Sequence, residues 1–266
     1  MTLPDSPPPG QGDTPPDDDL TDDGFLGGAL QILQPRRGYR AATDPVMLAA
    51  AMPTREGEEV LELGCGAGVA SLCLAHRTGA RPTGVELQPA YAALARRNAA
   101  RNGIAMEVLT ADLARLPPEA RRSFDHVMMN PPFFATGDGT PAADPGRETA
   151  NREDLPLATW TDAATRRLRP GGWLGVVHLA ERLPDLLRAL DGRIGTVSVL
   201  PLAGRAGRPA GRILLLGRKG GRGAFRLLPP LVMHEGADHE DGGGAFSPET
   251  LRILRGGEPL TAFRSN

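Results

Sequence analysis

Apolar positions fall into short runs and longer periodic stretches that alternate along most of the chain. Short apolar runs are typical of buried strands, and apolar residues every three to four positions are typical of helices. Such an alternation predicts an α/β fold, in which a mostly parallel sheet is covered by helices on both faces. The expected strands are Glu59–Leu63, Pro82–Glu86, Ala105–Thr110, Phe124–Met129 and Trp173–His178, and the expected helices are Gly68–His76, Pro89–Asn102, Leu155–Leu168 and Arg182–Leu190.

Two further apolar runs, Thr196–Pro201 and Gly211–Gly217, follow with no helix between them. They predict an antiparallel hairpin at one edge, which completes a seven-stranded sheet. Ligands of such folds bind at the carboxyl ends of the strands.

The two ends of the chain differ in composition from this core. Residues 1–24 are rich in Pro and Asp, with seven acidic and no basic side chains, and predict a disordered tail. We expect one domain over residues 25–235, opened by a short hairpin at Phe25 and an apolar helix before Glu59. Residues 236–266 predict a partly mobile C-terminal extension with a last short helix at Phe246–Arg255.

Composition places the chain among ordinary globular proteins, with 40% hydrophobic and 23% charged residues. No run approaches the roughly 18 apolar residues of a membrane span, and the N-terminus lacks signal-peptide features. We therefore expect a cytoplasmic protein. Cys65 and Cys73 match no metal-ligand spacing, so we expect reduced, structural cysteines and no metal site.

A glycine-rich loop lies between the first core strand and the helix after it. Gly64, Gly66 and Gly68 allow a tight turn and close approach of a ligand to the backbone. The spacing G-x-G-x-G differs from the G-x-G-x-x-G of dinucleotide-binding proteins. Glu86 ends the next strand, where a carboxylate can accept hydrogen bonds from ribose hydroxyls. Asp112 follows the strand after that and could accept from an adenine amino group. Each acid is also interpretable as a solvated strand-end residue.

The sequence Asn130-Pro131-Pro132-Phe133 follows the apolar strand FDHVMM. An exocyclic amino nitrogen is a weak nucleophile because its lone pair is delocalised. Two acceptors aimed at its protons, the Asn130 side-chain carbonyl and the Pro131 backbone carbonyl, would draw that lone pair towards an incoming methyl group. Phe133 offers a face on which a planar base can stack. A simple proline turn at the end of a strand is the alternative.

Together these motifs resemble class I S-adenosylmethionine-dependent methyltransferases with an (N/D/S)PP(Y/F) motif, which have a Rossmann-like fold. Within this class the chain is similar to the bacterial tRNA1(Val) adenine N6-methyltransferases. The similarity rests on QPRRGYRAATDPVMLAAAMP before the glycine loop and on Phe134, the second aromatic of NPPFF, and spans roughly Leu26–Lys219. It implies S-adenosyl-L-methionine as cofactor and, as acceptor, the N6 nitrogen of a tRNA adenine next to the anticodon.

The resemblance also implies site residues. Asp44 is among the residues expected to bind the cofactor, although the N-terminal cap of a helix is an equally good interpretation of it. The expected base-binding residues are Phe133 and Phe134. The expected cofactor-binding residues are Tyr39, Thr43, Asp44, Glu62, Gly64, Cys65, Gly66, Gly68, Glu86, Leu87, Asp112, Leu113 and Asn130.

Seven basic residues and no acidic one lie between Gly204 and Arg226. Among them Arg205, Arg208 and Arg212 are candidates for contacts with tRNA phosphates, and solvated arginines on an edge hairpin are the alternative. Three other functions use similar motifs or the same loop. They are methylation of rRNA guanine N2, methylation of a release-factor glutamine N5, and cofactor binding without catalysis.

Overall fold

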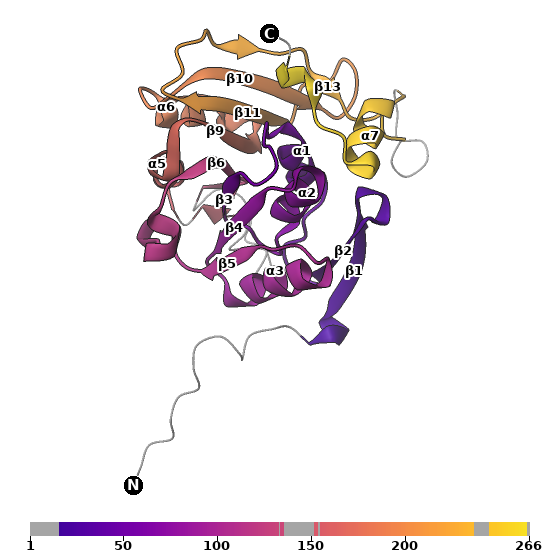
Figure 1. Cartoon of the computed structure of the whole chain (residues 1–266). Helices are drawn as coiled ribbons and strands as arrows, with labels where there is room; N and C mark the ends of the chain where they lie inside the picture. Colours follow the sequence, from indigo (N-terminus) through magenta and orange to yellow (C-terminus); the bar gives the residue numbers. More distant parts are fainter. Residues whose placement is uncertain (1–15, 133, 136–151, 154, 237–244, 265–266) are drawn as a thin grey trace.

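The alternating core forms as the sequence predicts, in a computed structural model that describes residues 16–132, 134–135, 152–153, 155–236 and 245–264 (Figure 1). The strands Glu59–Leu63 and Phe124–Met129 have the predicted bounds. Each apolar run ends shortly before a residue that interrupts strand pairing, Gly64 in the first case and Pro131 in the second. The core elements are α1 (Thr43–Ala51), β3 (Glu59–Leu63), α2 (Val69–Thr78), β4 (Arg81–Glu86), α3 (Pro89–Arg101), β5 (Glu107–Thr110), β6 (Phe124–Met129), α5 (Leu157–Arg167), β9 (Leu168–Leu179), α6 (Leu183–Leu190), β10 (Ile194–Ala203) and β11 (Arg212–Lys219).

The central sheet has the order β12-β10-β11-β9-β6-β3-β4-β5, and β13 also pairs with β10. Strands β5, β4, β3, β6 and β9 are parallel, and β11 runs antiparallel to both β9 and β10, which confirms the predicted hairpin. The predicted number of seven strands is wrong, because the sheet has nine. The additional strands, β12 (Arg226–Leu227) and β13 (Leu231–Val232), are two residues long, too short for a period of alternation to reveal.

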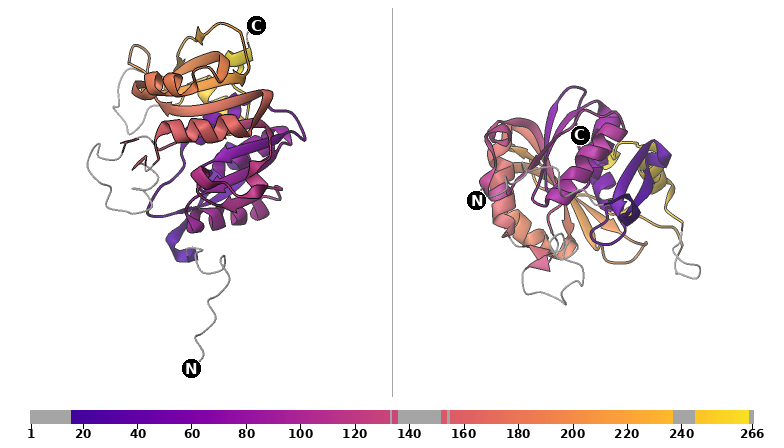
Figure 2. Two further views of the ribbon diagram at one scale, coloured as in Figure 1. Left: turned by 90° about the vertical axis from the view of Figure 1, so that its left-hand side faces the viewer. Right: turned by 90° about the horizontal axis from the view of Figure 1, so that it is seen from below.

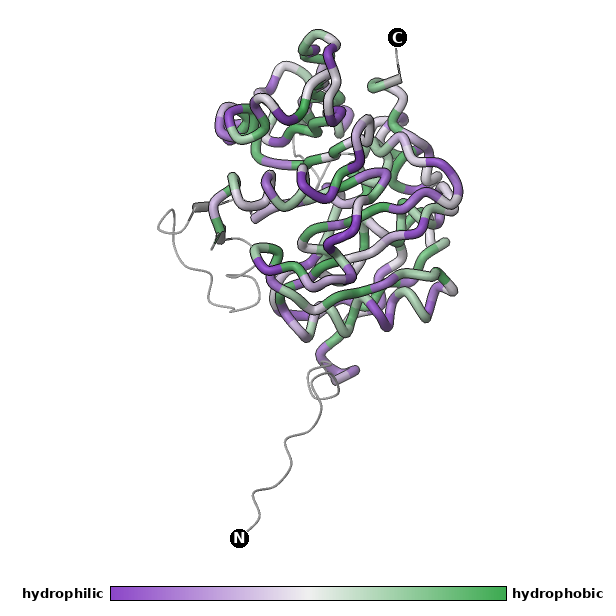
Figure 3. Tube along the Cα trace, turned by 60° about the vertical axis from the view of Figure 1, so that its left-hand side comes forward, coloured by the Kyte–Doolittle hydropathy of each residue, from purple (hydrophilic) through white to green (hydrophobic). Residues whose placement is uncertain are grey.

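Helices cover both faces of this sheet. Met128 points to one face, where it shares a core with Met47 of α1 and Leu72 of α2. Its neighbour Val127 points to the other face, in the core formed with α5 and α6. Figure 2 shows the helices on either side of the strands, and Figure 3 shows that apolar and polar residues alternate along much of the chain.

A separate two-stranded hairpin packs beside α3, and it begins earlier than the sequence predicts. Strand β1 (Leu20–Phe25) pairs antiparallel with β2 (Leu30–Pro35), joined by the 3-10 turn η2 (Leu26–Gly28) (Figure 1). The 3-10 turn η1 (Asp17–Asp19) precedes β1. Residues 17–24 are therefore ordered where the sequence predicts a disordered tail, whereas residues 1–15 of that tail lie outside the described residues.

The charges of this segment explain the error. Asp17 accepts from Arg97 at 2.6 Å and Asp22 pairs with Arg101, both on α3, while Leu20 is 4% exposed in a small core with Leu94. The acidic side chains thus have arginine partners about 80 residues away. Composition within the segment shows only its acidity and not those partners.

The C-terminal residues also belong to the fold. Helix α7 (Pro248–Gly256) confirms the predicted last helix, with Ser247 capping its start and Gly257 in the left-handed conformation at its end. Leu260, 2% exposed, donates its backbone N–H to the Ala50 carbonyl of α1 at 2.8 Å, and η6 (Thr261–Arg264) follows. Residues 245–264 therefore pack on the core. Within the described ranges, the helices lack the length and hydrophobicity of a membrane-spanning segment.

Candidate active site

A cleft with about 1160 Å³ of empty space, partly open to solvent, lies at the carboxyl ends of β3, β4, β5 and β6. This is the edge of a parallel sheet at which ligands are expected. Residues predicted for the site that line this cleft are Tyr39, Glu62, Gly64, Cys65, Gly66, Glu86, Leu87, Asp112, Leu113, Asn130, Pro131 and Pro132.

The glycine loop lies at the floor of the cleft. Gly64 has φ +69°, and a Cβ atom there would lie 2.8 Å from the Trp160 ring of α5, so no larger residue fits. The N–H of Gly66 donates to Glu86 at 2.9 Å. Gly68 does not line the cleft. It caps the N-terminus of α2 in the left-handed conformation, close to Ala95 of α3, and its predicted cofactor contact stays a prediction.

Glu86 ends β4, as predicted, and is 7% exposed. Its two carboxylate oxygens accept from the backbone N–H groups of Gly66 and Gln88, both at 2.9 Å. Burial nevertheless raises the pKa of Glu86. Since a carboxylate offers about four acceptor positions, these bonds leave capacity for a ligand hydroxyl group.

Asp112 caps the 3-10 turn η3 (Leu113–Arg115), and its Oδ1 accepts from the Ala114 N–H at 2.8 Å. Its Oδ2 accepts no hydrogen bond from the described residues. Leu87, 52% exposed, and Leu113, 9% exposed, add apolar contacts to the cleft. One free carboxylate oxygen between apolar side chains suits a flat ring with an amino group, such as adenine.

Glu62 lies near the end of β3 and is 3% exposed. Its Oε2 accepts from both the N–H and the hydroxyl of Ser71, but burial outweighs these bonds and raises the pKa of Glu62 to about 8. A bound cation would restore the charged form of this carboxyl group. The cleft therefore fits a ligand with positive charge at one end and a ribose and base at the other.

Asn130 follows β6 and lies at the cleft wall together with Pro131 and Pro132. Its Nδ2 lies 3.4 Å from the Tyr39 hydroxyl, to which it donates. Its Oδ1 is buried and accepts no hydrogen bond from the described part of the chain. A buried acceptor without a partner costs free energy, and a substrate N–H would relieve that cost.

The two aromatic candidates are less defined. Phe133 lies outside the described residues. Phe134 begins the short strand β7 (Phe134–Ala135), which pairs in parallel with β8 (Arg152–Glu153). Their predicted roles in base binding stay predictions.

The segment before α1 departs in part from the prediction. Tyr39 lines the cleft, but Thr43 and Asp44 do not. Both belong to the first turn of α1, and Asp44 forms an ion pair with Arg212 of β11 at 3.2 Å. Thr43 and Asp44 thus lie in α1 outside the cleft wall, and their predicted cofactor contacts stay predictions.

The basic run is also largely structural. Arg205 is 9% exposed, and its guanidinium donates to the carbonyl oxygens of Glu235 and Gly236 at 2.9 and 2.8 Å. The predicted phosphate contact for Arg205 is wrong, because the side chain is buried in these bonds. Arg212 is committed to Asp44, whereas Arg208 is exposed in the β10–β11 connection. Arg208 remains a candidate.

Sequence reasoning missed several residues of the cleft. Gln34 of β2, Tyr91 of α3 and Trp160 of α5 line it together with the motif residues. These residues lie far from the glycine loop in the sequence, so no local motif includes them. One signal could have pointed to Trp160, because it is the only large aromatic residue of α5, whose other residues apart from Leu157 are small or polar.

Comparison with known proteins agrees with this site. A methyltransferase domain model matches residues 60–142, which hold the glycine loop, both strand-end acids and NPPF. The fold is similar to a predicted O-methyltransferase from Agrobacterium tumefaciens (TM-score 0.66, 26% identity, 82% of this chain and 98% of that chain). It is also similar to a 16S rRNA methyltransferase of T. thermophilus in complex with AdoMet and guanosine (TM-score 0.53, 24% identity, 75% of this chain and 50% of that chain). The protein is thus a class I methyltransferase with S-adenosylmethionine as its cofactor.

The sequence relationship is narrower. Over 210 residues the chain is 31% identical to the tRNA1(Val) (adenine(37)-N6)-methyltransferase of Dickeya chrysanthemi, covering 77% of this chain and 83% of that protein. The chain belongs to this family of tRNA1(Val) (adenine(37)-N6)-methyltransferases.

Proposed function

We propose that this protein transfers the methyl group of S-adenosylmethionine to N6 of an adenine in tRNA, at position 37 next to the anticodon. The acceptor and its position follow the names of relatives such as the Dickeya chrysanthemi enzyme. The observation that carries the chemistry is the buried Oδ1 of Asn130, which has no partner among the described residues and lies in the wall of the cofactor cleft.

The residues of the cleft divide the work of binding the cofactor. Glu86 would accept from the ribose hydroxyls, the free oxygen of Asp112 from the adenine amino group, and Glu62 would balance positive charge at the methionine end. When bound, S-adenosylmethionine supplies an electrophilic methyl group on a sulfonium. Gly64 keeps the backbone next to Trp160 free of side chains.

Asn130 and Pro131 would act on the acceptor. The Asn130 Oδ1 and the Pro131 carbonyl accept the two protons of the N6 amino group and localise its lone pair towards the cleft. These hydrogen bonds strengthen as the nitrogen becomes pyramidal, so they lower the barrier more than they tighten binding. The adenine leaves its stack to reach the cleft, as bases do in enzymes that act on them.

A labelled methyl-transfer assay on separate pools of tRNA, rRNA and release factor tests the proposal. We expect label in tRNA, recovered as N6-methyladenosine, and none when adenine 37 of the substrate tRNA is replaced by guanine. Label in rRNA as N2-methylguanosine, or in release factor as N5-methylglutamine, would replace the proposed acceptor. Cofactor binding without transfer to any pool would indicate a non-catalytic protein.

Two related inferences rest on this function. A tRNA substrate implies phosphate contacts, for which the exposed Arg208 is the candidate that the structure leaves available from the predicted trio. Action on tRNA also agrees with the cytoplasmic location expected from the sequence, which stays a prediction.

A further inference from the structure

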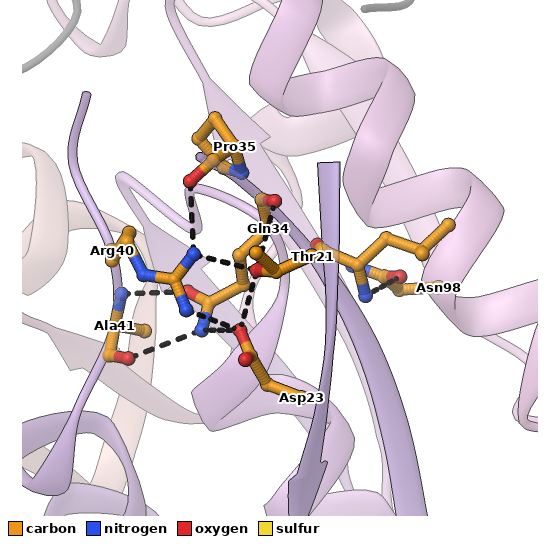
Figure 4. Close-up of polar contacts among 8 residues, drawn as sticks. Thr21, Asp23, Gln34, Pro35, Arg40, Ala41 and Asn98 are labelled. Atoms are coloured by element: carbon orange, nitrogen blue, oxygen red, sulfur yellow. Dashed lines mark hydrogen bonds and ion pairs between the residues drawn. The ribbon is translucent and has the colours of Figure 1, made fainter. Parts of the chain in front are cut away.

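Residues 36–42 connect β2 to α1, and we call them the strap. The strap places Tyr39 and Ala41 in the cleft wall. Three consecutive strap residues are held by side chains from other elements: Arg40 and Ala41 by the hairpin (Figure 4), and Tyr39 by Tyr91 of α3. This arrangement suggests that the hairpin sets the geometry of the site.

Gln34 of β2 fixes Ala41. The Gln34 side chain is buried, with 2% of the residue exposed, and its Oε1 accepts from the Ala41 N–H at 2.8 Å. Its Nε2 donates to the Ala41 carbonyl at 3.3 Å and to Asp23 at 2.9 Å. The buried Gln34 amide thus joins β2 to the strap by two hydrogen bonds to the Ala41 backbone, as a neighbouring strand would.

Asp23 of β1 joins these contacts to Arg40. Its Oδ2 accepts from Gln34 and forms an ion pair with Arg40 at 2.7 Å. Arg40 also donates to the Thr21 hydroxyl at 2.6 Å and to the Pro35 carbonyl at 3.1 Å. The strap therefore depends on both strands of the hairpin, and Figure 4 shows the polar groups converging on the strap.

Tyr39 connects the strap to Asn130. Its N–H donates to the Tyr91 hydroxyl at 2.8 Å, and that hydroxyl donates back to the Tyr39 carbonyl at 3.1 Å. The Tyr39 hydroxyl lies 3.4 Å from the Asn130 Nδ2. With Nδ2 turned to Tyr39, the Oδ1 of Asn130 is on the opposite side of the amide, free for a substrate proton.

The electrostatics of the cleft keep Tyr39 in its neutral form. Burial, together with nearby acidic groups, raises the pKa of Tyr39. The oxygen of this neutral hydroxyl can accept the hydrogen bond that the Asn130 Nδ2 donates.

We propose that Tyr39 is a positioning residue that orients the Asn130 amide, and that the β1–β2 hairpin holds Tyr39 in place through Gln34, Asp23 and Arg40. The inference rests on the proposed function, because the orientation of Asn130 has consequences only if its Oδ1 accepts from the methyl acceptor. It assigns to the hairpin a role in catalysis in addition to packing.

The first test is a double-mutant cycle measured by single-turnover methylation of tRNA at saturating cofactor. Tyr39→Phe keeps the ring and removes the hydroxyl, so we expect the rate to fall about five- to tenfold, as for loss of one hydrogen bond. Cofactor affinity, measured separately by calorimetry, should change less than about twofold, since the lost bond goes to Asn130. In an Asn130→Ala background, Tyr39→Phe should cause no further loss of rate.

The outcomes separate the two hypotheses. A wild-type rate for Tyr39→Phe, or full additivity with Asn130→Ala, overturns the positioning role. A wild-type rate for Asn130→Ala itself overturns the proposed mechanism, whatever Tyr39 does.

The second test compares two glutamines of the same strand. Gln34→Ala removes the contacts with the strap, whereas Gln31→Ala removes only an exposed bond to the Gly28 carbonyl. We expect Gln34→Ala to slow methylation at least as much as Tyr39→Phe and to speed hydrogen exchange at the Ala41 amide. Gln31→Ala should match wild type in both measurements. Unchanged exchange and rate in folded Gln34→Ala protein would contradict the role of the hairpin.

Discussion

Replacement of Asn130 by alanine is the most direct test of the chemistry. The structure gives this residue a buried Oδ1 without a partner in the described chain, so alanine removes an acceptor that is prepared before the substrate arrives. Loss of one preorganised hydrogen bond that strengthens in the transition state costs about 2.7–4 kcal/mol, which corresponds to about 10²–10³ in rate. We expect a loss of this size in single-turnover methylation of tRNA.

Binding should change little, because Asn130 is expected to contact the acceptor nitrogen mainly as it reacts. Calorimetry of S-adenosylmethionine binding should therefore give nearly the wild-type dissociation constant. Asn130→Asp keeps an acceptor oxygen at the same place and should lose less activity than the alanine variant. If Asn130→Ala methylates tRNA at close to the wild-type rate, the reasoning from the unpaired oxygen is wrong.

Four further predictions concern the cofactor cleft and the RNA contact. Glu86→Ala should raise the cofactor dissociation constant about tenfold or more, since a charge-assisted pair is lost, and unchanged calorimetric affinity would contradict the ribose contact. Gly64→Ala should weaken cofactor binding and lower the melting temperature more than Gly57→Ala, a position with similar φ and open space, because only Gly64 faces Trp160; equal effects would exclude the steric argument. Burial raises the pKa of Glu62 to about 8 in the folded protein, from about 4.5 in the unfolded chain. Between these two values the folded state holds a proton that the unfolded state has lost. The free energy of unfolding should therefore fall by about 1–2 kcal/mol as the pH rises from about 6.5 to 8. Urea titrations should show that Glu62→Gln reduces this fall, and an identical pH profile would refute it. Arg208→Ala should weaken tRNA binding and reduce its salt dependence, whereas Arg205→Ala should lower the melting temperature instead; the reverse pattern in binding and melting assays would reject both assignments.

Local patterns were enough to predict the core of the fold. The β3 and β6 strands are apolar runs that stop at Gly64 and before Pro131, so their bounds are determined by neighbouring residues. Helices α2 and α3 were predicted from their helical periodicity, and the end of α3 was predicted from Gly103, which follows it. The β1 strand was missed because its stability depends on charges that α3 supplies from a distant part of the sequence.

The site divides in the same way. Gly64, Glu86 and Asn130 were found because each belongs to a motif of a strand and the turn after it. Gln34 was missed because its function appears only once β2 lies beside the strap. Arg205 was assigned to phosphate binding because a run of like charges gives no sign of which side chains fold inward, and its bonds to Glu235 and Gly236 depend on the path of the C-terminal segment.

Asn98 of α3 shows why the hairpin and the cofactor loop act as one unit. It is fully buried, and its Oδ1 accepts from the Leu33 N–H of β2 at 2.8 Å (Figure 4). Its Nδ2 donates to the carbonyl oxygens of Leu33 and of Ala67 in the glycine loop, both at 3.0 Å. One side chain therefore joins β2, α3 and the loop that approaches the cofactor. Because the same strand also holds the strap through Gln34, a shift of the hairpin would move the glycine loop and the strap together, and both line the cleft.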